Sequence, residues 1–207
     1  MRVAPLLAFG IATATGASAA AAQSAFEGVI TATAYAEGQG TEVVFRVKGG
    51  KIRMELIEDG DRGILIADGT GSVISVDDAE RVYYRVPPPP DRGPELPDLV
   101  RLGRSETVAG HRCEYFRYPL SAEDGEAVDV CIATGLGFMG WIRAELSSPA
   151  EERRLRRQFP AGAVILKAVE PGGAVAFLVA KIERTRLSDA LFAPPAGYRE
   201  VRLPGSE

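Results

Sequence analysis

The chain has 207 residues and a formal net charge of −4, so it lacks the basic excess with which nucleic-acid-binding proteins neutralise phosphates. Hydrophobic residues make up 46% of it, enough for one domain with a sizeable core. With a single histidine and two cysteines, it offers no cluster at metal-ligand spacing and no serine-based triad. We therefore expect no nucleic-acid partner, no metal, no cofactor and no enzymatic activity.

Residues 1–22 have the form of a secretory signal peptide. Arg2 is followed by an apolar stretch too short for a stable membrane anchor, and then by small residues in A-x-A order. Cleavage after Ala22 and cleavage after Ala19 both fit this pattern. Removing residues 1–22 removes Arg2 and no acidic residue, so the formal charge becomes −5. No later apolar run is long enough to span a bilayer. We expect an exported, periplasmic protein with one domain over residues 23–207.

Six short strands are predicted in the first part of this domain, where β-branched and aromatic residues recur between turn-forming residues. Gly49 and Gly50 are suited to a tight two-residue hairpin turn, because glycine readily adopts positive φ. The predicted strands are residues 26–35, 41–47, 51–59, 62–68, 71–77 and 80–86. Four consecutive prolines at positions 87–90 end this run, because proline cannot donate to a sheet ladder.

Both cysteines lie in a further predicted hairpin, with arms at residues 113–118 and 126–132. If Cys113 faces Cys131, an oxidising compartment favours a disulfide between them. The same register places Tyr115 opposite Asp129 and Arg117 opposite Ala127. The other face of the hairpin is then almost wholly apolar, as expected for a strand pair that packs on a core. That face carries Phe116, Tyr118, Val128, Val130 and Ile132.

A reactive thiol with its base is the alternative interpretation, because His111 lies two positions before Cys113. Residues two apart in a strand share one face at a fixed distance, so they do not meet head to head. We therefore favour a structural disulfide. His111 is expected at the surface, in the turn before the hairpin.

The remaining chain predicts one helix and one more hairpin. The helix, within residues 147–159, has Ser148 as its N-cap, Pro149 in its first turn and Glu151 completing a capping box. The hairpin, residues 163–187, turns at Pro171 and the two glycines that follow. Strands and helices do not alternate along the chain. We therefore predict a mainly β fold, an antiparallel sheet strongly curved around one or two helices.

Three motifs suggest binding, and each has a simpler structural explanation. Residues 135–140 fit G-x-G-x-x-G, but they follow an antiparallel arm and not the βαβ unit that binds dinucleotides. The arginine-rich run 153–157 fits a solvated helix face paired with Glu151 and Glu152, or else a site for anionic lipid head groups or a partner. Residues 138–141, with the single tryptophan, fit either a plug of the core or a lid over a cavity.

Several stretches together resemble an uncharacterised family of exported bacterial proteins with a domain of unknown function. They are FEGVITATA, KIRMEL, GILIADGTGSVISVDDAERVYYRV, ETVAGHRCEYFRY with VDVCIAT, and LFAPPAGYREV. The motifs that match are Arg53, the Asp68-Gly69 turn, Gly110 before the first cysteine, and the ending from Phe192 to Tyr198. In layout the family is similar to the periplasmic lipoprotein carriers and receptors of the LolA and LolB type. The resemblance implies a half-open β-barrel wrapped around a helix, with an apolar concavity.

Two departures from the carriers stand against lipoprotein carriage itself. The carriers' aromatic residue after the Asp-Gly turn is replaced here by Val73 or Ser75, and the cysteine pair is additional. We expect a non-enzymatic protein that binds a lipid, acyl chain or other hydrophobic ligand in the concavity. The alternative is an envelope interaction protein with a filled barrel and a protein partner at its surface. The expected cavity residues are Phe116, Tyr118, Val128, Val130, Phe138, Met139 and Trp141.

Overall fold

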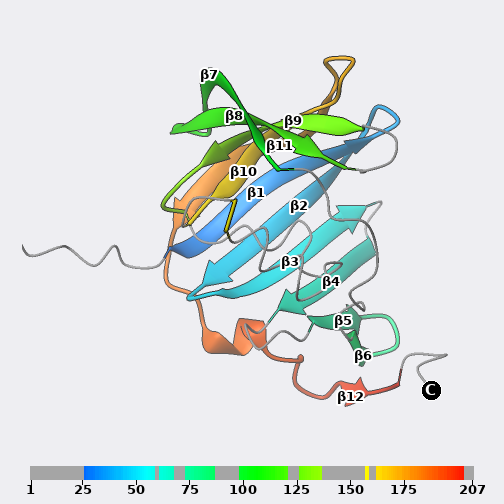
Figure 1. The fold of residues 1–207 in the computed structure, drawn as a ribbon. Helices are drawn as coiled ribbons and strands as arrows, with labels where there is room; N and C mark the ends of the chain where they lie inside the picture. The colour runs from blue at the N-terminus through cyan, green and yellow to red at the C-terminus, as the bar shows by residue number, and fades with distance from the viewer. Residues whose placement is uncertain are drawn as a thin grey trace, which may run out of the picture.

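The computed structural model describes residues 26–58, 61–67, 73–86, 98–120, 126–136, 157–158 and 162–202, and these form one twisted sheet of twelve strands (Figure 1). The first six strands are β1 (Glu27–Ala36), β2 (Gln39–Lys48), β3 (Lys51–Glu58), β4 (Asp61–Ala67), β5 (Val73–Asp77) and β6 (Val82–Val86). The others are β7 (Val100–Val108), β8 (His111–Pro119), β9 (Ala127–Ala133), β10 (Val164–Val169), β11 (Val175–Arg184) and β12 (Arg199–Glu200). The predicted two-residue turn joins β2 to β3, with φ of 56° at Gly49 and 87° at Gly50.

The sheet consists of two antiparallel meanders that meet at β1. Its strand order is β12-β6-β5-β4-β3-β2-β1-β11-β10-β9-β8-β7, so β1 has β2 on one side and β11 on the other. The pairing of β12 with β6 is parallel, which makes the sheet mixed. In Figure 1 the strands β7 to β9 lie at the top, and β5, β6 and β12 lie at the bottom.

The predicted barrel wrapped around a helix is wrong. The outermost strands are β12 and β7, which do not pair with each other, so the sheet stays open. In the described part of the chain, helical structure is limited to the 3-10 turn η2 (Asp189–Phe192) and to residues 157–158 at the end of the predicted helix. One-sided apolar alternation is common to open and closed sheets, because each buries one face, so it does not determine whether the edges meet.

The main core lies mostly on the inner face of the sheet, and at β8 and β9 it also includes the outward-facing Cys113, Tyr115 and Cys131. Alternation turns Phe45 and Val47 of β2 inward, while Arg46 and Lys48 point to the outer face. The Phe45 ring meets that of Phe177 on β11 edge to face, with centroids 6.5 Å apart. The largest fully buried side chains include Phe26, Phe45, Ile30, Leu136, Leu166, Val130 and Val164.

A smaller cluster lies on the outer face, beneath the C-terminal segment. Phe192, the last residue of η2, is buried against Ile64 and Ile66 of β4 and Ile74 and Val76 of β5. Burial of a phenylalanine side chain contributes about 1.5–3 kcal/mol. The outer face of β4 and β5 is therefore covered by the end of the chain.

Gly28 allows close contact where the two meanders join. It pairs with Arg184 of β11, and a Cβ at this position would lie 2.1 Å from the carbonyl oxygen of Glu183. Any side chain there would force β1 and β11 apart.

Candidate functional site

The disulfide hairpin is formed by β8 and β9, but its register is not the predicted one. Tyr115 pairs with Cys131 and Arg117 with Asp129, so the predicted register is wrong by two residues. The Sγ atoms of Cys113 and Cys131 are nevertheless 2.07 Å apart, with 5.3 Å between the Cα atoms. The cysteines are therefore diagonal neighbours, which strand twist brings together. Because the shift is by two residues, the same side chains still share each face.

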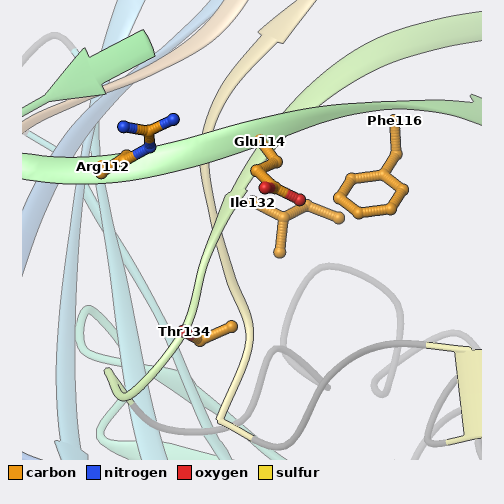
Figure 2. Close-up of a pocket in the computed structure, with 5 residues that line it drawn as sticks. All are labelled: Arg112, Glu114, Phe116, Ile132 and Thr134. Atoms are coloured by element: carbon orange, nitrogen blue, oxygen red, sulfur yellow. The ribbon is translucent and has the colours of Figure 1, made fainter. Parts of the chain in front are cut away.

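The inner face of this hairpin carries a hollow of about 420 Å³. Figure 2 shows its lining, in which alternate residues of β8 are joined by two residues from β9 and the turn that follows it. The lining residues are Arg112, Glu114, Phe116, Ile132 and Thr134. Phe116 and Ile132 supply the apolar part of the surface, and the other three supply polar and charged groups.

Polar contacts with the edge strand β7 position the charged residues of the hollow. The Arg101 guanidinium donates to the Glu114 carboxylate at 2.5 Å, and Arg112 donates to the Ser105 hydroxyl at 3.2 Å. Both contacts tie these charged side chains to β7. The arrangement offers apolar contact at one part of a ligand and charge or hydrogen bonding at another.

The predicted cavity residues meet the hollow only in part. Phe116 lines it, whereas Tyr118, Val128 and Val130 lie on the same sheet face without lining it. Three more predicted residues lie outside the described part of the chain: Phe138, Met139 and Trp141.

The sequence prediction missed Arg112, Glu114 and Thr134 as lining residues, and it placed Ile132 on the apolar face without assigning it to the cavity. The period of two that marked Phe116 also marks Glu114 and Arg112 on the same face. Arg112 was missed because the strand was predicted to start at Cys113, whereas β8 begins at His111. Glu114 lies inside the predicted strand and was missed because only apolar and aromatic residues were assigned to the cavity.

The outer face of the hairpin carries a network of charged residues near the disulfide. Glu106 accepts hydrogen bonds from the Tyr115 hydroxyl at 2.5 Å and from Lys167 Nζ, which lies 3.1 Å from both carboxylate oxygens. The hydrogen bond from Tyr115, followed by that from Lys167, lowers the pKa of Glu106. Burial, reinforced by the bond to Glu106, raises the pKa of Tyr115.

A second carboxylate on this face, Asp129, is held by two arginines. Arg117 Nε lies 2.9 Å from it and Arg104 Nη2 lies 2.7 Å from it. The hydrogen bond from Arg117 is the main cause of a lowered pKa of Asp129. The Arg104 guanidinium also stacks over the Tyr115 ring, 3.8 Å from its centroid. Since every one of these groups has a partner, the network links β7, β8, β9 and β10 structurally.

The thiol and base interpretation finds no geometric support here. Cys113 is joined to Cys131, and His111 stands at the start of β8, paired with Val108 across the turn. Among the described residues, no group of three or more histidine, cysteine, aspartate or glutamate side chains is arranged to hold a metal ion. The same part of the chain contains no helix that is long and apolar enough to cross a membrane.

The comparison with known families identifies the chain. A family model for a domain of unknown function, DUF4412, matches residues 26–198, so the chain belongs to that family. No curated protein matches it. Two crystal structures of PNGF-II, in space groups C2 and P21, are similar at TM-scores of 0.45 and 0.49 with 11% and 12% identity. Each similarity covers 86% of this chain but only 31% or 32% of PNGF-II, and at these values it carries no functional argument.

Proposed function

We propose that this protein is a non-enzymatic binding protein of the periplasm, which takes up a lipid, an acyl chain or another hydrophobic ligand in the hollow of β8 and β9. The observation that carries the proposal is the hollow itself, where Phe116 and Ile132 lie beside Arg112 and Glu114. A volume of about 420 Å³ lies within the range of small-molecule sites. Apolar contact with a few placed polar groups is also typical of such sites.

The chemistry of the lining favours an amphipathic ligand. An alkyl chain that packs against Phe116 and Ile132 removes apolar surface from water, which is favourable by about 25 cal/mol per Å² of apolar area. Arg112 and Glu114 suit a polar head group at the same site. The N-terminal segment, which has the form of a signal peptide, suggests the compartment.

The direct test is uptake of a fluorescent fatty acid by the purified protein. In Thr134→Phe a ring would occupy the hollow from an exposed position, so we expect an affinity for cis-parinaric acid about tenfold weaker. Val100→Phe adds the same ring on the exposed edge strand β7 and should bind like the unmodified protein. Because the sequence predicts Trp141, the single tryptophan, as a cavity residue, we expect its emission to shift when the ligand enters.

Native mass spectrometry of protein purified from the periplasm completes the test. A bound lipid mass that is lost in Thr134→Phe supports the proposal. A clean apo mass, with no uptake of fatty acid, would contradict it and favour an envelope interaction protein that acts through its surface.

A further inference from the structure

The outer face of the β2–β3 hairpin carries cationic side chains in an unusual arrangement. Arg46 is paired directly with Arg53, and in the next outward-facing row Lys48 is paired with Lys51. Like charges directly opposite each other in a sheet are destabilising. Two consecutive pairs of this kind, in a chain of net charge −4, call for anionic partners on this face.

One buried carboxylate lies among the arginines. Glu55, which is only 4% exposed, has Oε1 at 2.6 Å from Arg46 Nη1 and at 2.7 Å from Arg53 Nε. Its other oxygen lies 3.8 Å from Arg62 Nε on β4. Burial raises the pKa of Glu55, but the hydrogen bond from Arg53 and the charges of Arg46 and Arg53 outweigh this and hold the pKa below its ordinary value. Glu55 is therefore an anion that lies within ion-pair distance of three guanidinium groups and accepts a hydrogen bond from Arg53.

The two lysines have a different role, because they hold the C-terminal segment. Lys48 Nζ donates to the Leu187 carbonyl at 2.8 Å, and it lies 3.3 Å from Asp189 and 3.7 Å from Glu27. Lys51 Nζ lies 3.4 Å from the other oxygen of Asp189. The lysines are thus neutralised by acidic side chains of their own.

The arginines are not neutralised to the same extent. Among the described side chains, Arg46, Arg53 and Arg62 share the single carboxylate of Glu55, which leaves two positive charges in excess. Arg46 Nη1 is buried and, despite its short contact with Glu55, has no partner with the geometry of a hydrogen bond in the described structure. Arg62 is half exposed, so its guanidinium is open to solvent.

We propose that Arg46 and Arg62 form a binding site for a phosphate group, either free or in the head group of an anionic phospholipid. The two arginines approach opposite oxygens of the Glu55 carboxylate, so both guanidinium groups lie beside the same side chain on the outer face. Guanidinium groups bind phosphate through paired, charge-assisted hydrogen bonds. Among the described side chains, the excess of two positive charges matches a phosphate dianion better than a single carboxylate.

This site does not depend on the hollow. Side chains alternate along β2, so Arg46 lies on the face opposite to Phe45, and the register places Phe45 and Phe116 on the same inner face. Ligand uptake in the hollow and phosphate binding by the arginines can therefore fail separately.

The first experiment is an NMR titration with inorganic phosphate that follows the Nε–Hε signals of the arginines. We expect Arg46 and Arg62 to shift together, and the double variant Arg46→Gln/Arg62→Gln to weaken phosphate affinity about tenfold or more. Arg85→Gln is the matched control, because Arg85 is paired with Glu200 on the same face of the sheet and should leave the affinity unchanged. Melting temperatures of all variants establish that they fold.

The second arm identifies the source of the phosphate. If the protein sediments with phosphatidylglycerol vesicles but not with phosphatidylcholine vesicles, and the double variant no longer sediments, the ligand is a lipid head group. Phosphate binding without sedimentation supports a free phosphate.

Two outcomes overturn the proposal. One is that neither phosphate nor vesicles bind, as expected if the acidic side chains of the β3–β4 turn, which lie outside the described ones, already neutralise the arginines. The other is that binding is the same in the double variant.

Discussion

The two ends of the outer face use the same types of residue in different ways. At the β7–β10 end, Glu106 is bound by a lysine and a tyrosine, and Asp129 is bound by two arginines. A disulfide lies beside them. At the β2–β4 end, one buried carboxylate, Glu55, serves three arginines. Composition does not distinguish these clusters, whereas the ratio of acceptors to donors does. Among the described side chains, three cations share two carboxylates in the first network, called balanced below, whereas three share one in the second, called unbalanced. The second network therefore keeps more donors for the proposed ligand.

The largest effect is expected at the unbalanced end. Glu55→Ala removes the carboxylate that holds three guanidinium groups, and breaking a buried ion pair in this way costs about 3–5 kcal/mol in the free energy of unfolding. Urea denaturation measures the loss. Glu55→Gln, which keeps the shape and one acceptor oxygen, should lose less. A loss in Glu55→Ala below about 1 kcal/mol would show that the arginines are held by other groups.

Loss of the disulfide tests the balanced end. The double variant Cys113→Ala/Cys131→Ala removes a link between residues 18 apart in the sequence. It should lower the free energy of unfolding by about 3 kcal/mol in the chain-entropy model, with the fold retained. The same denaturation experiment measures it. Free thiols that titrate in protein expressed in an oxidising compartment would contradict the pairing.

Acid should weaken both ends, and the buried carboxylate should contribute more. The pKa values of Glu55, Glu106 and Asp129 are lowered in the folded state from ordinary values of 4.5, 4.5 and 3.8. A lowered pKa contributes stability that is present above the ordinary value and is lost as pH falls through the folded value. Unfolding free energies measured from pH 7 to pH 3 should therefore decline below about pH 4.5.

Two variants show which end of the sheet causes the loss of stability in acid. The pH dependence should be flatter in Glu55→Gln than in Asp129→Asn, because Glu55 is almost fully buried. Equal slopes would mean that burial does not separate the two ends.

The smallest effect concerns the hydroxyl of Tyr115. Tyr115→Phe removes its hydrogen bond to Glu106 and should lower stability by about 1 kcal/mol, while Lys167 continues to hold the carboxylate. Thermal unfolding measures the difference. Tyr35→Phe, at an exposed position in β1, serves as the control and should change nothing. A larger loss of stability in Tyr115→Phe than in the disulfide variant would show that the hydrogen-bond network stabilises this end more than the disulfide does.

The sequence allowed the strands to be predicted better than their arrangement. Period-two alternation and the Gly49-Gly50 turn predicted β2 and β3 correctly, because both depend on neighbouring residues. The open edges at β7 and β12 depend on contacts across the whole chain, which no local pattern encodes. The register of β8 and β9 was predicted by opposing the cysteines, and a diagonal disulfide satisfies the same chemistry with a shift of two.

The arginine cluster was recognisable only as single residues. Arg46, Arg53 and Glu55 lie on neighbouring strands, so a convergence on one carboxylate becomes visible only once β2 and β3 are in register. Arg53 was marked by resemblance alone, with no role assigned to it. The hollow was predicted in part, through Phe116, because the alternation that places this residue on the inner face is a local pattern. Where that face is hollowed depends on contacts between distant segments, which a local pattern does not encode.

The junction of β1 with β11 determines how this sheet can assemble over time. Each meander is built from neighbouring strands, whose contacts form quickly because little chain must be closed to make them. The joining pair brings Gly28 to Arg184, so most of the polypeptide must be looped before that contact forms. We expect refolding to show a slow final phase that reports on this joining step. A nascent chain that has not yet reached β11 must keep one edge of β1 unpaired, and in that interval it is exposed to edge-to-edge aggregation.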